Sequence, residues 1–249
     1  MYDEDKISVG MYVPLNFSSG KYFRYIAPRV IFEFVHRNPK DSLPEEMFTG
    51  DYRAMTYNLY AYNLLRSSKR DVRSRWGQVI NVTYRHTPFG GNDYGSVLAL
   101  QGALYLPSPV RHHAFRIGYD YQKITDWKNG NVFDNVVSYP RGYESEVNQT
   151  LQMVSLSYKL PLICPDFNVG SLVYFKRIKM NLFMDYAKGD ILYGSTLNRE
   201  YLSYGTEITS DTHFLRLWIP FDVGCRLSYI PDKEKVFPEL LFNIDLSGF

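Results

Sequence analysis

The residues of this chain best suited to charge recognition are an arginine in a short polar segment and one acid in a later apolar stretch. Residues 138–143 read SYPRGY, and residues 182–187 read LFMDYA. The motif Pro140, Arg141, Gly142 and Tyr143 could dock as a loop tip, because a guanidinium forms charge-assisted, two-bonded pairs with a carboxylate such as that of Asp185. Gly142 allows a turn at positive φ, and Tyr143 can pack against a wall. In a hydrated site the pair would contribute about 1 kcal/mol. The alternative is an ordinary surface turn and an unrelated acid.

Histidine and aspartate pairs are the candidates for acid–base catalysis. His213 lies two residues from Asp211 on one predicted strand face, and His112 and His113 lie together in a predicted turn. Nucleophilic catalysis needs a nucleophile, a base and a group that orients the base. Neither pair has a serine or a third group that the sequence places beside it. We therefore expect that the protein is not an enzyme.

Metal and nucleic-acid chemistry have little support in the sequence. His36 and His86 lie near predicted strand ends far apart, and the two cysteines are Cys164 in a predicted turn and Cys225 on an apolar strand face. These positions fit neither a metal-ligand spacing nor a disulfide framework. The net charge of +2 is spread over both signs. We expect no metal, no cofactor and no nucleic-acid partner.

Alternation of apolar and polar residues predicts the elements that must position these side chains. Leucines alternate with other residues from 96 to 106, and aromatic or aliphatic residues alternate with polar ones from 115 to 122. A soluble β-sandwich also alternates. Strands of ten or more residues, repeated charges within strands and abundant aromatic residues near strand ends favour a transmembrane β-barrel. A barrel would place Leu98, Leu100, Ile117 and Tyr119 on its outside.

Period-two stretches and their breakers predict eleven strands. They are 6–17, 24–36, 53–65, 74–88, 95–106, 113–125, 149–160, 171–187, 201–214, 219–230 and 238–248. Short connections at 18–20, 107–111 and 217–220 alternate with long ones at 38–51, 128–149 and 188–200, and the connection at 231–238 is intermediate. Short turns on one side and long loops on the other are typical of outer-membrane barrels.

The number of strands predicts an incomplete barrel. A single-chain antiparallel barrel of this type has an even number of strands, so at least one strand is missing from the eleven. The amino terminus, MYDEDKISV, has no signal-peptide pattern. We expect residues 1–249 to be one transmembrane β-barrel domain, the carboxyl-terminal portion of a longer protein.

The two motifs resemble the signature of the bacterial surface-antigen superfamily, which includes BamA-type insertases and the translocators of two-partner secretion. The resemblance implies a barrel of sixteen strands, an Arg-Gly-aromatic tip in the sixth outer loop and a Phe-x-Asp-x-Gly segment on the thirteenth strand. Five predicted strands follow the motif here, and Asp185 lies on the second of them, so the chain would cover the sixth to sixteenth strands. Pro140 replaces the usual aliphatic residue, and Ala187 replaces the glycine.

Two further positions carry the resemblance. Gly205 and Glu207 resemble the glycine-led opening of the strand after the aspartate strand, and Glu207 would join an inward-facing network with Arg226. The alternative is that these are unrelated polar residues of the inner face. Phe249, at the end of an alternating strand, resembles the carboxyl-terminal signal read by the outer-membrane assembly machinery.

The resemblance implies a function in inserting or translocating polypeptides at the bacterial outer membrane. The partners would be outer-membrane lipid, a polypeptide substrate or other subunits of a membrane complex, and missing amino-terminal strands or a periplasmic domain. The alternative is a structural or channel-forming barrel that anchors a periplasmic domain or a larger complex.

Overall fold

The computed structural model describes residues 2–39, 50–68, 71–89, 93–125, 132–170, 172–191, 198–214 and 221–244. Their regular structure is β-strand, apart from one 3-10 turn at Pro231–Lys233, so the predicted all-β class is confirmed. The strands are β1 (Tyr2–Tyr12), β2 (Leu15–Asn16), β3 (Tyr22–Pro39), β4 (Gly50–Leu65), β5 (Gly77–His86), β6 (Ser96–Pro107), β7 (Ala114–Thr125), β8 (Asn148–Ile163), β9 (Phe167–Val169), β10 (Val173–Ile191), β11 (Asn198–Phe214), β12 (Phe221–Ile230) and β13 (Lys235–Ile244). Among these residues no helix is long and apolar enough to cross a membrane.

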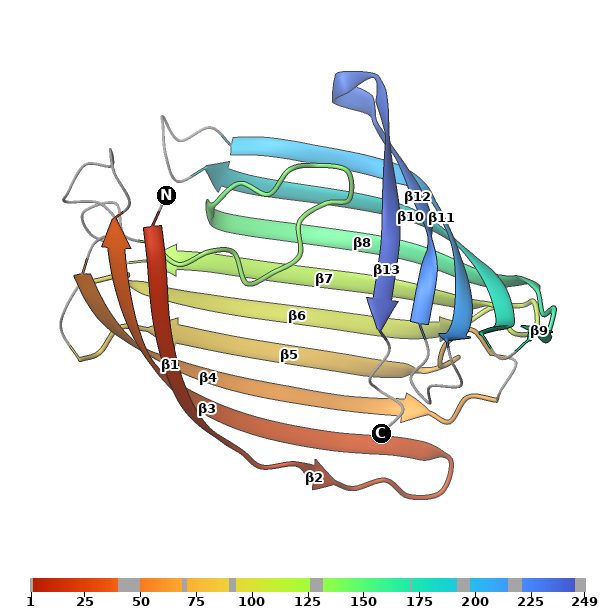
Figure 1. Cartoon of the computed structure of the whole chain (residues 1–249), viewed down its shortest axis with the longest axis horizontal. Coiled ribbons are helices and arrows are strands. Elements are labelled where there is room, and N and C mark those ends of the chain that lie inside the picture. Colours follow the sequence, from red (N-terminus) through yellow and green to blue (C-terminus); the bar gives the residue numbers. More distant parts are fainter. Residues whose placement is uncertain are drawn as a thin grey trace.

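All thirteen strands belong to one antiparallel sheet in which neighbours in the sequence are neighbours in space. The short strands β2 and β9 pair only with β3 and β10. The sheet is strongly curved, and its two edges, β1 and β13, both lie in front of the central strands (Figure 1). Over the described ranges β1 and β13 do not pair with each other, so the sheet is open.

The first predicted strand, 6–17, is divided into β1 and β2. Its ladder with β3 is interrupted between the pair Tyr12–Arg29 and the pair Leu15–Ile26. Pro14 lies in this interval, where the register places Val13 opposite Pro28 and Pro14 opposite Ala27. The Val13 N–H donates to the Pro28 carbonyl at 3.1 Å, but neither proline has a backbone N–H to donate, so the ladder is interrupted at this point.

The predicted connection at 231–238 is wrong in length, because only residues 231–234 join β12 to β13. Glu234 takes the left-handed conformation with a φ of 48°, and its N–H donates to the Pro231 carbonyl at 3.1 Å. Pro238 lies inside β13, which is an edge strand and therefore tolerates a residue without an N–H. The predicted turn that begins at Cys164 also contains the short strand β9.

One face of the sheet is apolar and exposed. Ile117, Leu156 and Met184 are successive register partners on β7, β8 and β10, and they are 38%, 42% and 44% exposed. Leu98 and Tyr119 are also exposed, and Leu100 is partly exposed. In the isolated chain these side chains are therefore not sealed in a core, as a soluble β-sandwich would require.

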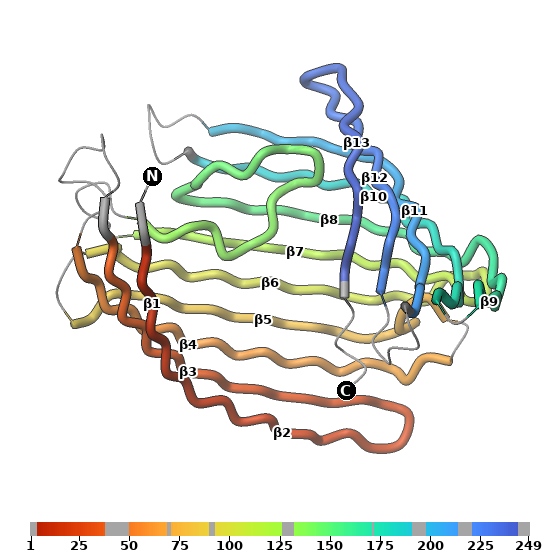
Figure 2. The backbone as a smooth tube through the Cα atoms, viewed as in Figure 1, coloured from red at the N-terminus to blue at the C-terminus, as the bar shows by residue number. Residues whose placement is uncertain are grey.

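The opposite, concave face is polar and buried. Its buried residues include Asp120, Gln122, Ser155, Ser157, Asn181, Asp185, Ser203, Glu207 and Asp211. The segment 132–147, which joins β7 to β8, folds back across this face instead of extending away from the sheet (Figures 1 and 2). Alternation along each strand thus separates an apolar outside from a polar inside.

The segment 132–147 packs on two apolar clusters of the concave side. Phe133 packs in a cluster with Val35, Tyr52, Ala54, Tyr94, Val97 and Ile124. Val137 packs in a second cluster with Ala99, Leu151, Met153, Ala187 and Tyr201. The Gln122 side-chain carbonyl accepts hydrogen bonds from the backbone N–H groups of Val136 at 2.6 Å and Val137 at 3.3 Å. These contacts lay the segment along the sheet and aim its tip, residues 140–143, at β10–β12.

Candidate functional site

The loop tip is a tight turn that only glycine fits. The Tyr143 N–H donates to the Pro140 carbonyl at 3.2 Å, and Pro140 is fully buried. Gly142 has a φ of 85°, and a Cβ added there would lie 2.7 Å from the Cβ of Ser228 on β12. Both the backbone conformation and the close approach to β12 therefore require glycine at this position.

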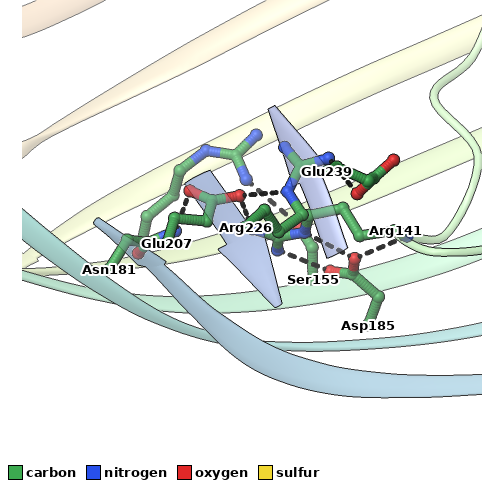
Figure 3. Close-up of polar contacts among 8 residues, drawn as sticks. Arg141, Ser155, Asn181, Asp185, Glu207, Arg226 and Glu239 are labelled. Carbon is green, nitrogen blue, oxygen red and sulfur yellow. Dashed lines mark hydrogen bonds and ion pairs between the residues drawn. The ribbon is translucent and has the colours of Figure 1, made fainter. Parts of the chain in front are cut away.

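Arg141 and Asp185 form a two-bonded ion pair on the concave face (Figure 3). Arg141 Nε donates to Asp185 Oδ2 and Nη2 donates to Oδ1, both at 2.7 Å. The Arg141 backbone N–H adds a third bond to Oδ2 at 3.1 Å. The Asp185 side chain is only 2% exposed, so this carboxylate is paired almost entirely by the loop tip.

A second acid, Glu207 on β11, extends the pair into a network (Figure 3). Its carboxylate accepts hydrogen bonds from Arg141 Nη1 at 3.2 Å, Asn181 Nδ2 at 2.8 Å and Arg226 Nε at 2.8 Å. Arg226 also donates to Glu239 on β13 at 3.1 Å. Burial alone would lower the pKa of Arg141, but the hydrogen bonds and charges of the two acids outweigh it and raise this pKa above its usual value. Arg141 therefore stays charged.

The Arg141 guanidinium also lies on an aromatic ring. Its Cζ is 3.8 Å from the centroid of Phe183, which is the register partner of Gly205 on β11. A Cβ at Gly205 would lie 2.9 Å from the Phe183 ring and 1.9 Å from the Leu227 carbonyl oxygen. The missing side chain at 205 thus leaves room for the ring, and the ring supports the guanidinium by a cation–π contact.

Tyr143 completes the docked tip. Its hydroxyl donates to the Leu202 carbonyl at 3.1 Å, and its ring meets Tyr201 edge to face, with centroids 5.1 Å apart. Tyr139 packs on the other side of the tip against the same Tyr201 ring, at 5.3 Å. The four motif residues therefore contact three successive strands, β10, β11 and β12.

Asp211 on β11 is ion-paired to two cations of β10. Both acceptor atoms of Asp211 face cations, with Arg177 Nη2 at 2.5 Å and Lys179 Nζ at 2.6 Å. His213 lies against the ring of Tyr174, with centroids 5.8 Å apart. Asp211 therefore acts as a counter-ion and does not orient a base.

The histidines of the 108–113 turn make structural contacts. His113 Nδ1 is 2.7 Å from the Tyr158 hydroxyl, and His112 Nδ1 is 2.8 Å from Asp71 Oδ1 in the turn between β4 and β5. Burial by itself would raise the pKa of Asp71, but hydrogen bonds from the Ser68 N–H and from His112 outweigh it and lower this pKa. The Asp71 carbonyl accepts a bond from Arg177 at 2.9 Å, which ties this turn to β10.

The structure describes both cysteines but not the predicted assembly signal. Within the described ranges no three His, Cys, Asp or Glu side chains are grouped to hold a metal, and Cys164 and Cys225 are free and exposed. Phe249, the predicted assembly signal, lies outside the described residues.

Phe183 and Asn181 belong to the network but were not among the predicted site residues. The alternation along β10 gives both the same face as Asp185. An aromatic residue at an inward position opposite a glycine was the signal in the sequence for Phe183.

No protein-family model, curated protein or solved structure matches this chain.

Proposed function

We propose that this chain is a β-barrel domain of the bacterial outer membrane that resembles the surface-antigen superfamily and takes part in inserting or translocating polypeptides. The observation that carries the proposal is the docked tip, in which Arg141 is held by Asp185 and lies on Phe183. The resemblance implies such a contact between the sixth outer loop and the thirteenth strand. The position of the tip, five strands before the end of the sheet, supports the same proposal.

The two faces of the sheet support a location in a membrane. Apolar side chains such as Leu156 and Leu182 are exposed on the outside, while the ionised groups of Arg141, Asp185 and Glu207 lie on the concave side. Exposure of a large apolar surface to water is unfavourable by about 25 cal/mol per Å². Acyl chains would remove that penalty, and the concave side would remain hydrated.

The open edges support a role in polypeptide insertion. In hydrocarbon each unpaired backbone group costs several kcal/mol, so β1 and β13 would require strand partners in a membrane. Leu240 in β13 is 93% exposed, as expected for an uncovered edge strand. Missing strands of a sixteen-stranded barrel, or an incoming substrate strand, would satisfy these edges by backbone pairing.

Reconstitution tests this function. The protein would be placed in phospholipid vesicles, a urea-unfolded barrel protein would be added as client, and client assembly would be followed by its heat-modifiable mobility in gels. We expect faster client assembly with the wild-type protein than with empty vesicles. With Arg141→Glu we expect the rate of client assembly to fall to that of empty vesicles. As a matched control, Arg199→Glu removes an exposed ion pair with Glu146 and should leave assembly unchanged.

Two results would count against the proposal. A protein that stays monomeric and folded in water without detergent would exclude the membrane location. A wild-type protein that conducts ions across vesicles but leaves client assembly unchanged would favour the channel-forming or anchoring alternative.

A further inference from the structure

Three cations on the concave side form no ion pair with any described residue. Arg73, Arg116 and Lys159 line one polar cavity of about 530 Å³ beneath the docked tip. Among the described residues no carboxylate oxygen lies within ion-pair distance of any of the three, whereas Arg141 and Arg226 in the same cavity are both ion-paired. A cavity of this size can hold a small molecule.

The strand register places the three cations together. Arg116 on β7 is the register partner of Tyr105 on β6 and of Ser157 on β8. Lys159 lies two residues beyond Ser157 and therefore on the same face of β8. Arg73 reaches in from the turn between β4 and β5, with Nη1 donating to the Tyr105 hydroxyl at 3.3 Å.

The cations are held in place without being neutralised. Arg116 Nη1 donates to Ser155 Oγ at 3.0 Å, and a Cβ at Gly118 would lie only 2.8 Å from the same Nη1. Gly118 thus leaves the space that the guanidinium occupies. Among the described residues Lys159 donates no hydrogen bond to the protein, and it lines the cavity together with Arg73.

Five cationic and three acidic side chains line the cavity. Of the acids, Asp185 and Glu207 are paired with Arg141, and only Asp120 is without an ion pair in the part of the chain that the structure describes. Asp120 interacts electrostatically with Arg116, so the five cations exceed the three acids by two charges, on the side formed by Arg73, Arg116 and Lys159. Gathering three like charges is unfavourable unless an anion neutralises them.

We propose that this cavity binds a phosphate-bearing ligand through Arg73, Arg116 and Lys159. Guanidinium forks match the geometry of phosphate oxygens, and an ammonium adds a compact point charge. The ligand enters from the hydrated concave side, and its phosphoryl oxygens replace the missing acidic partners. This binding does not depend on client assembly, and the docked segment forms part of the cavity wall through Ser138, Tyr139 and Arg141.

Isothermal titration with sodium pyrophosphate, on the protein folded in neutral detergent, tests the proposal. Lys159→Gln and Arg116→Gln each remove one charged donor, and we expect each to raise the Kd by about tenfold. Arg111→Gln, at an exposed position in the neighbouring turn, removes the same charge outside the cavity and should leave the Kd within about twofold of wild type. Arg73→Gln, outside the sheet, gives a variant that should fold even if the strand variants do not.

Absence of pyrophosphate binding, or equal weakening by Arg111→Gln and Arg73→Gln, would overturn the proposal. A second arm identifies the source of the phosphate. Displacement of pyrophosphate by dihexanoyl phosphatidic acid, but not by dihexanoyl phosphatidylcholine, supports the site with a lipid phosphomonoester as ligand. Pyrophosphate binding that neither lipid displaces supports the site with a water-soluble phosphate compound as ligand.

Discussion

Arg141 is the residue on which the geometry of the candidate site depends. It donates four hydrogen bonds, three to Asp185 and one to Glu207, and lies on the Phe183 ring. A hydrated pair would be worth about 1 kcal/mol. Since the Asp185 side chain is 2% exposed, removal of its partner leaves a buried, unpaired charge, for which losses of about 3–5 kcal/mol are typical.

Reversal of the charge at position 141 should release the loop tip. We expect Arg141→Glu to raise the rate of proteolysis within the segment 132–147 by about 100-fold, because about 3 kcal/mol of docking energy is lost and cleavage follows the open population. Adding Asp185→Arg should restore protection only in part, since Glu207 would repel the new carboxylate. Unchanged cleavage in the single variant would contradict the docking role.

Gly142 allows the effect of backbone conformation to be separated from that of crowding. Gly142→Ala should destabilise the docked loop by the strain of a left-handed alanine, about 1–2 kcal/mol, and further by the clash with Ser228. Gly170→Ala is the matched control, because Gly170 has a φ of 58° and open space around it. If urea unfolding showed that both variants lose the same unfolding free energy, the contact of position 142 with β12 would not contribute to stability.

Residue types and their spacing predicted Arg141, Asp185 and Tyr143, because charge pairing and period two specify both type and facing. Glu207 was predicted from the family resemblance and from its inward parity. The contact between Arg141 and Phe183 was not predictable in the same way. An inward aromatic residue has no obligatory partner in the sequence, and its use depends on the space that Gly205 leaves on the next strand.

At the scale of elements, Asp71 bonds the turn between β4 and β5 to His112 in the next turn and to Arg177 on β10. The folded-state pKa of Asp71 is lowered, so its carboxylate contributes stability that is fully present above its usual pKa near 4 and is lost as the pH falls through the folded-state value. We expect Asp71→Asn to destabilise the protein by about 1 kcal/mol at pH 7 and by nothing near pH 2. Urea unfolding followed by tryptophan fluorescence measures this. A difference in unfolding free energy between the two proteins that is the same at both pH values would exclude the assignment.

The eleven long strands were predictable because each alternates over ten or more residues between two clear turn signals. The interruption at Pro14 was not, since it also depends on Pro28 lying opposite the neighbouring residue Val13, and this register is set by the hairpin between the strands. The short turn at 231–234 was missed because Pro238, which reads as a strand breaker, is tolerated on the edge strand β13.

At the scale of the whole molecule, the exposed face makes a prediction that depends on depth in a membrane. Leu156 lies in the middle of β8, and Gln152 lies on the same face nearer its end. Leu156→Arg should reduce folding into lipid vesicles by about 2–4 kcal/mol, whereas Gln152→Arg should cost about 0–1 kcal/mol. Equal effects in the two variants would show that this face does not meet hydrocarbon.

The path of the segment 132–147 also sets an order of events during synthesis. Every residue that holds the tip, from Asp185 and Leu202 to Ser228, follows Arg141 in the chain. The tip therefore has no complete docking surface until β10, β11 and β12 have been made, and it can dock only when these strands are paired in register. A chain whose synthesis stops before β12 would carry an undocked loop, which quality-control proteases could cleave.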